Sequence, residues 1–282
     1  MAKKELPAHI AAALAGAGGA GDSAGQSWAG RDLSGEGNPL HQFDQDDGST
    51  DPAYEAALQW LAAGTGGEAE VVAALANARV FVPIVATLGE EAEGSGGLTS
   101  DKQADMALVT LQAPDGRRAL PAFSNTAALA AWHPEARPVA VYAPRAALAA
   151  VSEDAELMVM DPGAALTFVV RRPAVWALAK QHEWVPSYRD PALLDWVAEA
   201  TNSEDAVLAA SVEPGTGIAV RTADGSVVAG GGHGPELRLV LQVRDGLGRE
   251  ELAAMAGRIQ KRLQARQEFA ERVDSLELKF TR

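Results

Sequence analysis

The spacing of hydrophobic and polar residues predicts two helices directly after residue 50. Asp51-Pro52 predicts the start of the first helix, because a carboxylate at the N-cap accepts hydrogen bonds from free backbone amides and a proline in the first turn removes none. The glycines that begin at Gly64 predict its end. From Glu68, apolar residues recur at helical spacing, which predicts the second helix.

A β-rich region follows these helices. Residues 79–86 predict a strand, and Pro83 within it indicates a sheet edge or a bulge because proline lacks the amide that a ladder needs. Residues 106–111 are apolar at every position but one, which predicts a single strand covered on both faces. The turn residues at 113–116 then predict a hairpin with a strand at 119–123.

Helices and strands continue to alternate up to residue 180. Ser124 stands where an N-cap is expected, ahead of a helix that buries Leu129 and Trp132 and ends before Pro134. The later segments are strand 138–142, helix 145–151, strand 157–160, a turn at Asp161-Pro162-Gly163, strand 166–170 and a helix that opens at Pro173.

The last third of the chain repeats this mixture. It begins with a helix after Asp190-Pro191 that faces Leu193, Leu194 and Val197 inward, and a hairpin of 207–212 with 218–221 follows. A sharply alternating strand is predicted at 237–243 and a last strand at 276–280. Between these two strands lies a helix that buries Leu252, Met255, Ile259 and Leu263. The glycine-rich run at 230–234 predicts a loose turn around His233.

These segments predict an α+β protein with two mixed α/β domains whose sheets contain hairpins. Periodicity lapses at 182–189, so we place the domains at 51–185 and 190–282. Residues 1–50 are rich in Gly, Ser and Asp, and such a segment buries too little apolar surface to offset its ordering entropy. We expect a short helix at 6–15 within an otherwise flexible acidic lead-in.

Charge and composition exclude several classes of function. The net charge of −14 argues against binding to nucleic acid or to an anionic membrane, which require a concentrated positive face. The absence of cysteine excludes disulfides, thiol catalysis and cysteine metal sites. No apolar run approaches the ~18 residues that cross a bilayer, so we expect a cytoplasmic protein.

Short motifs that match known chemistry lack the structural context that the chemistry needs. The run at 16–21 matches the dinucleotide fingerprint and 21–25 matches the nucleophile elbow, but both lie in low-complexity sequence without a strand before or a helix after. Asp44, Asp46, Asp47 and Asp51 do not follow the spacing of a calcium loop, and no two of the five histidines stand at ligand spacing. We therefore expect no catalytic residue, no cofactor and no metal.

The order of elements between residues 50 and 185 resembles the N-terminal domain of the SseB family, which is named for an enhanced serine sensitivity phenotype. The resemblance rests on the strand at 106–111, the segment Pro121-Ala122-Phe123-Ser124 that enters a helix, and Trp132, Pro138 and Asp161-Pro162-Gly163 in that order. The segments at 28–31 and 46–48 are similar to the lead-in of actinobacterial members. The resemblance implies no reaction, cofactor or catalytic residue.

Two sets of residues are candidates for a functional surface. Arg118, Ser124, Asn125 and Arg137 predict a small polar pocket around the Pro121–Ser124 segment. Trp28, Arg31 and Phe43 are candidate anchors for a partner, because they stand in a segment too polar to fold alone.

The leading hypothesis is a non-enzymatic protein-binding module with an unidentified protein partner, linked to serine or amino-acid physiology as the family name suggests. A small-molecule sensor or an enzyme that uses the pocket near Arg118, Ser124 and Arg137 is the first alternative. A secretion-associated structural component is the second alternative.

Overall fold

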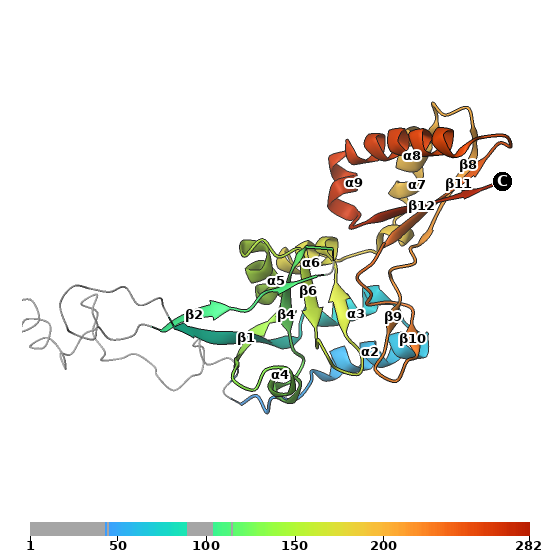
Figure 1. Cartoon of the computed structure of the whole chain (residues 1–282). Helices are drawn as coiled ribbons and strands as arrows, with labels where there is room; N and C mark the ends of the chain where they lie inside the picture. The colour runs from blue at the N-terminus through green and yellow to red at the C-terminus, as the bar shows by residue number, and fades with distance from the viewer. Residues whose placement is uncertain (1–42, 44, 89–103, 114) are drawn as a thin grey trace, which may run out of the picture. The chain divides into compact units, whose positions relative to one another are not determined.

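The structure is a computed structural model that describes residues 43, 45–88, 104–113 and 115–282 (Figure 1). The chain divides into two compact units, residues 1–47 and 48–282. Helices and several sheets alternate in the second unit, which confirms the α+β class. The helix expected at 6–15 lies outside the described residues.

The first two helices follow the sequence prediction. Helix α2 (Pro52–Ala63) begins where the Asp51 carboxylate accepts from the amides of Ala53 and Tyr54, at 2.9 and 3.2 Å, and it ends at Gly64 with φ +71°. Helix α3 (Glu68–Leu75) buries the three apolar residues that its spacing selects.

A three-stranded antiparallel sheet has the order β2-β1-β5. Its strands are β1 (Arg79–Leu88), β2 (Ala104–Leu108) and β5 (Arg137–Tyr142). Pro83 is predicted to mark a sheet edge or a bulge; β1 as a whole is the central strand, but at Pro83 it pairs with β5 alone. Pro83 lies opposite Pro138, and pairing with β2 starts only at the next residue, so no partner needs the amide that proline lacks.

The second sheet has the order β3-β4-β6-β7. Its strands are β3 (Leu111–Gln112), β4 (Arg118–Ala122), β6 (Leu157–Met160) and β7 (Phe168–Val170). The hairpin of β3 with β4 is confirmed, and β4 and β6 run parallel. The single strand expected at 106–111 was wrong: the chain leaves the first sheet after Leu108 and enters the second at Leu111, because each segment pairs with a different strand.

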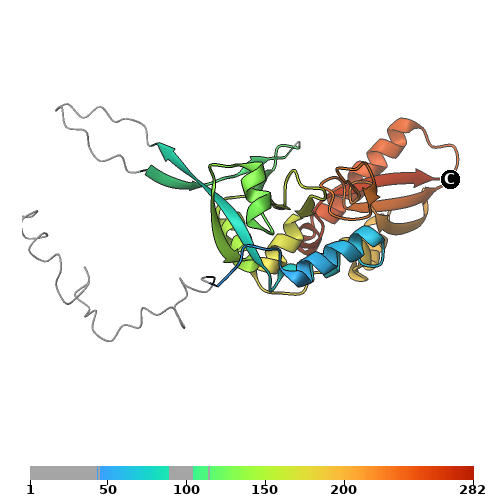
Figure 2. The ribbon, with the colours of Figure 1, turned by 90° about the horizontal axis from the view of Figure 1, so that it is seen from below.

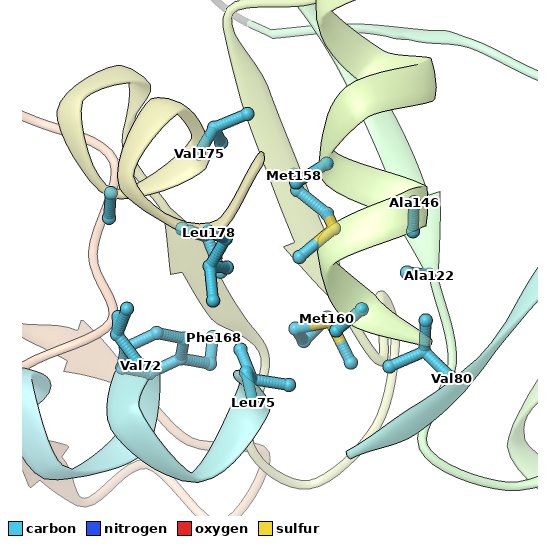
Figure 3. Close-up of a cluster of buried hydrophobic side chains, with 14 of the residues drawn as sticks. Val72, Leu75, Val80, Ala122, Ala146, Met158, Met160, Phe168, Val175 and Leu178 are labelled. Carbon is cyan, nitrogen blue, oxygen red and sulfur yellow. The ribbon is translucent and has the colours of Figure 1, made fainter. Parts of the chain in front are cut away.

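The main hydrophobic core lies between one face of this second sheet and four helices. Alternate residues of the strands supply it, since successive strand side chains point to opposite faces. Figure 3 shows side chains of α3, β6 and of α6 (Arg172–Ala179) meeting there: Val72, Leu75, Met158, Met160, Val175 and Leu178. Helix α5 (Ala143–Ser152) contributes its alanine face.

The C-terminal part has its own sheet and core. Its elements are η1 (Ser187–Arg189), α7 (Ala192–Thr201), β8 (Val207–Pro214), β11 (Leu237–Val243), α8 (Arg249–Gln264), α9 (Gln267–Arg272) and β12 (Leu276–Thr281). The sheet order is β12-β11-β8, and the red strand that ends at the C-terminus in Figure 2 is β12. The alternating residues of β11 are buried as predicted.

Leu193 and Val197 of α7 pack inward as expected, but Leu194 is 50% exposed. Positions four apart share a helix face, whereas the adjacent position turns away from it, so the inward orientation expected for Leu194 was wrong.

The hairpin expected between 207–212 and 218–221 was also wrong. Strand β8 pairs with β11, and the short β9 (Val220–Arg221) pairs with β10 (Val227–Val228). The longer strand β11 forms a ladder with β8 that runs from Leu237 to Val243, whereas the two-residue β9 is too short to offer one. Val228 packs in the main hydrophobic core, although it lies in the part of the chain assigned to the second predicted domain. The domain boundary at 182–189 stays a prediction.

Glu204, which follows α7, connects to α8 through two arginines. Its carboxylate lies 2.6 Å from Arg258 Nη2 and 2.8 Å from Arg262 Nη1, and the hydrogen bonds from Arg258 and Arg262 lower the pKa of Glu204 to about 2 from 4.5. A lowered carboxylate pKa stabilises the fold above pH ~4.5, and this contribution disappears as the pH falls to ~2.

Glu204→Gln is therefore expected to lower the free energy of unfolding by about 1–2 kcal/mol at pH 7, a modest value because both arginines are partly exposed to solvent. Urea denaturation at pH 7 and near pH 2 measures the difference, which should vanish at the lower pH. Glu156→Gln, on an exposed position without a side-chain partner in the described structure, is the control. A Glu204→Gln effect that is equal at both pH values would contradict the ion-pair explanation.

No helix in the described part of the chain has both the length and the apolar character needed to cross a membrane.

Candidate functional site

The structure brings together two of the four residues predicted to form a polar pocket. Ser124 and Asn125 lie side by side, with Asn125 Nδ2 donating to Ser124 Oγ at 3.2 Å. Arg118 is exposed at the start of β4, about 20 Å along the strand direction from Ser124. Arg137 is exposed at the start of β5, opposite Ile84. The pocket expected from all four residues stays a prediction.

Ser124 is not the N-cap of α4 (Thr126–Trp132), which corrects the sequence prediction. Asn125 caps this helix, because its Oδ1 accepts from the amide of Ala128 at 2.7 Å. Ser124 is only 4% exposed, and its own amide donates to Asp161 Oδ1 at 2.7 Å.

Asp161 closes this small cluster at the carboxyl ends of the parallel strands β4 and β6. It adopts a φ of +50°, unusual for a residue other than glycine, and burial raises the pKa of its carboxyl group. Neither of the cavities described below is lined by Ser124, Asn125 or Asp161. The hydrogen bonds of this cluster connect the ends of β4 and β6 to the start of α4.

A larger concave surface lies beside α6, and we call it the linker groove. Its cavity measures about 720 Å³, within the ~300–1,000 Å³ range of ligand sites. It is lined by α6, by residues 182–185, by the start of the segment leading into α7 and by α9. The residues are Arg172, Pro173, Trp176, Ala177, Lys180, His182, Glu183, Trp184, Val185, Asp190, Pro191, Gln267, Ala270, Glu271 and Arg272.

Two large apolar side chains of the linker groove are left in water. Trp176 is 44% exposed and Val185 is 48% exposed. The Lys180 ammonium lies 5.2 Å from the centre of the Trp176 ring. Exposed apolar side chains that line one cavity mark a surface suited to a partner, whereas single exposed ones are ordinary.

Several rim groups of the linker groove are held in place. Arg172 Nη2 donates to the carbonyl oxygens of Ala270 and Val273, at 2.8 and 3.0 Å, which fixes α9 beside α6. Arg272 Nη1 donates to Asp190 Oδ2 at 2.9 Å. The α6 and α9 walls of the groove are therefore tied to each other by hydrogen bonds.

A second cavity of about 570 Å³, the α3 pocket, adjoins the linker groove. The two cavities share His182, Glu183 and Trp184, and the α3 pocket is otherwise lined by Ala69, Glu70, Val72, Ala73, Ala76, Asn77, Leu178 and Gln181. Trp184 Nε1 is buried and has no hydrogen-bond partner among the residues that the structure describes. Burying such a donor without a partner costs about 1–3 kcal/mol.

A buried charged cluster, the Arg171 hub, supports the segment that carries these cavities. It consists of Arg171, Glu68, Glu236 and Asp274, whose side chains are almost fully buried. Arg171 donates to the carbonyl oxygens of Gly234 and Gly217, at 2.6 and 3.0 Å, and lies 3.5 Å from the carboxylate of Asp274.

The two glutamates of the hub hold the backbone on either side of Arg171. Glu68 accepts from the amide of Gly231 at 3.0 Å and from the Tyr188 hydroxyl at 3.1 Å. Glu236 accepts from the amides of Ser187 and Asp274, at 3.2 and 2.9 Å. Burial raises the pKa of both glutamates, although these hydrogen bonds and the charge of Arg171 oppose the shift.

The glycine run at 230–234 is part of this arrangement and is not the loose turn expected from the sequence. Its backbone bonds to Glu68 and Arg171, and Gly230, Gly231 and Gly232 are buried. Only His233 is exposed.

Of the three candidate anchors from the sequence, Phe43 alone lies within the described residues. Phe43 lies in a turn of the first unit, where its carbonyl oxygen accepts from the amide of Asp46 at 3.0 Å. Trp28 and Arg31 lie outside the described residues, so all three stay predicted anchors. Over the described ranges, no three His, Asp or Glu side chains are grouped to hold a metal ion.

Comparison with known proteins identifies the domain that carries α3 and most of α6. Residues 54–177 match the family model described as the SseB protein N-terminal domain. No curated protein and no solved structure gives a match. The chain therefore carries an SseB protein N-terminal domain over residues 54–177, which confirms the SseB assignment made from the sequence.

Proposed function

We propose that the chain is a non-enzymatic, cytoplasmic module that binds another protein, and that the linker groove is its binding surface. The observation that carries the proposal is the pair of exposed apolar side chains, Trp176 and Val185, on one preformed cavity. Tryptophan is enriched among the residues that dominate binding energy at protein interfaces.

The occupant that fits this surface is a segment of a partner protein with a large apolar side chain. The aromatic and aliphatic lining supplies apolar contact area, and the charged rim supplies polar groups around it. The net charge of −14 favours a basic protein over nucleic acid as the partner. A link to serine or amino-acid physiology belongs to the same proposal.

Trp176→Ala is expected to weaken capture of the partner at least about ten-fold, because the truncation removes the largest exposed apolar contact of the groove. The measurement is quantitative affinity purification from lysate with the full chain as bait. Trp60→Ala is the matched control, since Trp60 is a similarly exposed tryptophan on α2 outside both cavities.

A protein recovered with wild type and the Trp60 variant but lost with the Trp176 variant supports the proposal. Equal recovery with both variants would place the binding surface elsewhere and overturn it. Circular dichroism of the three proteins separates lost binding from lost folding.

The volume of the linker groove also favours a second candidate, a small-molecule sensor. We place the ligand of such a sensor in the linker groove, whose cavity has the volume of a ligand site, and the pocket near Arg118, Ser124 and Arg137 stays the other predicted location. A thermal-shift screen over amino acids and nucleotides tests it, because a ligand present at 100 times its dissociation constant adds ~2.7 kcal/mol. A stabilisation that Trp176→Ala abolishes would favour the sensor, and no shift with any compound would exclude it for these ligand classes.

A further inference from the structure

The segment 182–184 lines both cavities. One is the linker groove, with its apolar contacts at Trp176 and Val185, and the other is the α3 pocket. An occupant that fills only one cavity leaves the other to water. A chain that crosses the segment fills both, which a compact small molecule does less readily.

The charge of the α3 pocket differs from that of the linker groove. Glu70 and Glu183 line the α3 pocket, and no lysine or arginine does. Within the described residues Glu183 forms no ion pair, and Glu70 accepts through Oε2 from the amide of Gly67 at 2.9 Å. The linker groove, by contrast, carries both signs of charge, because its lining includes three basic and three acidic residues: Arg172, Lys180, Arg272, Glu183, Asp190 and Glu271.

Trp184 gives an independent indication of an acceptor from outside the chain. Its indole N–H can only donate, it is buried, and it lacks a partner between the two cavities. A backbone carbonyl group of a chain that crosses the 182–184 segment would supply the acceptor that this donor lacks.

We infer that the partner segment is a short peptide with an aromatic or large aliphatic side chain in the linker groove and a lysine or arginine in the α3 pocket. The basic side chain meets Glu70 and Glu183, and a carbonyl group between the two side chains accepts from Trp184 Nε1. The inference rests on the proposed function and specifies the chemistry of its partner.

The test uses the full chain labelled with nitrogen-15 and unlabelled blocked peptides of the form acetyl-Trp-(Gly)n-Arg-amide with one to three glycines. Each peptide has a matched version with glutamate in place of arginine. The indole N–H signals of Trp176 and Trp184, assigned from Trp176→Phe and Trp184→Phe, report binding at the two cavities.

At low salt, the arginine peptide with the best spacing is expected to shift both indole signals and to bind at least about ten-fold more tightly than its glutamate version. The combined variant Glu70→Gln and Glu183→Gln should bring the two affinities within about two-fold. Glutamine at position 70 retains an oxygen that accepts from Gly67, so the start of α3 is preserved. Glu156→Gln, outside both cavities, should leave the preference unchanged.

Equal affinity of the two peptide classes overturns the inference, as does a preference that survives in the combined glutamine variant. Shifts confined to other residues also overturn it, because the basic peptide would then bind an acidic region elsewhere. The proposed function fails on a different result, equal partner capture by Trp176→Ala and Trp60→Ala, so the two failures are distinguishable.

Discussion

Replacing Arg171 with methionine is expected to lower the free energy of unfolding by about 3–5 kcal/mol. The change removes the cation whose charge acts on the carboxylates of Glu68 and Glu236, whereas Asp274 keeps its ion pair with Arg117 at 2.9 Å. Breaking a buried ion network from one side leaves uncompensated charge. The change also leaves the carbonyl oxygens of Gly217 and Gly234 without their donor. Urea denaturation followed by tryptophan fluorescence measures the loss.

The pH dependence of this loss has a definite sign. Burial raises the pKa of Glu68 and Glu236 above the ordinary 4.5, so the native state binds more protons than the unfolded state as the pH falls toward that value. Without Arg171, the burial of the two charged carboxylates destabilises the native state more than it does in the wild type. Protonation therefore restores more stability to the variant than to the wild type. The deficit of Arg171→Met should therefore be smaller near pH 5 than near pH 8.

Arg118→Met is the matched control for the loss of an arginine, because Arg118 is exposed and lacks a side-chain partner in the described structure. We expect its effect to stay within ~0.5 kcal/mol. An Arg171→Met protein as stable as the Arg118 variant would show that the hub does not hold the fold together. A variant that fails to fold at pH 8 is compared at pH 5, where recovery is the expected result.

Local signals in the sequence predicted the elements whose structure depends only on residues that are close together in the chain. The Asp51 cap and the alternation from Leu237 to Val243 are confirmed, because a side-chain cap and a buried sheet face leave a direct pattern in the chain. Ser124 shows the limit of such signals. It is a good N-cap residue, but Asp161, distant in sequence, takes its amide, and Asn125 caps the helix.

Strand pairing and the candidate site depend on contacts that no local pattern encodes. The partner of β8 was decided by competition between β9 and the longer β11, which lies farther along the chain. Glu68 reads as an ordinary first-turn acid of α3, yet it bonds to Gly231 at 3.0 Å. The one available signal was the glycine run itself, since closely spaced glycines mark places where backbone approaches backbone.

Gly217→Ala and Gly257→Ala are expected to change stability in opposite directions. A Cβ atom at position 217 would lie 2.0 Å from the carbonyl carbon of Gly234, so one of the two backbone segments that bond to Arg171 must move. We expect a loss of at least about 3 kcal/mol, the upper range for overpacking a buried site. A Cβ atom at position 257 meets nothing within 4 Å on the exposed side of α8.

Gly257→Ala should therefore stabilise the protein by about 0.5–1 kcal/mol, because alanine favours the helix and restricts the unfolded chain. Urea denaturation of both variants against wild type measures the two effects. Only Gly217→Ala should also shift the indole N–H signal of Trp184, because Gly217 bonds to Arg171 and the glutamates of the hub hold Ser187 and Tyr188, which follow Trp184 closely in the chain. A Gly217→Ala protein with unchanged stability would mean that the backbones of residues 217 and 234 do not pack against each other. That result would also contradict the conclusion that the Arg171 hub supports the two cavities.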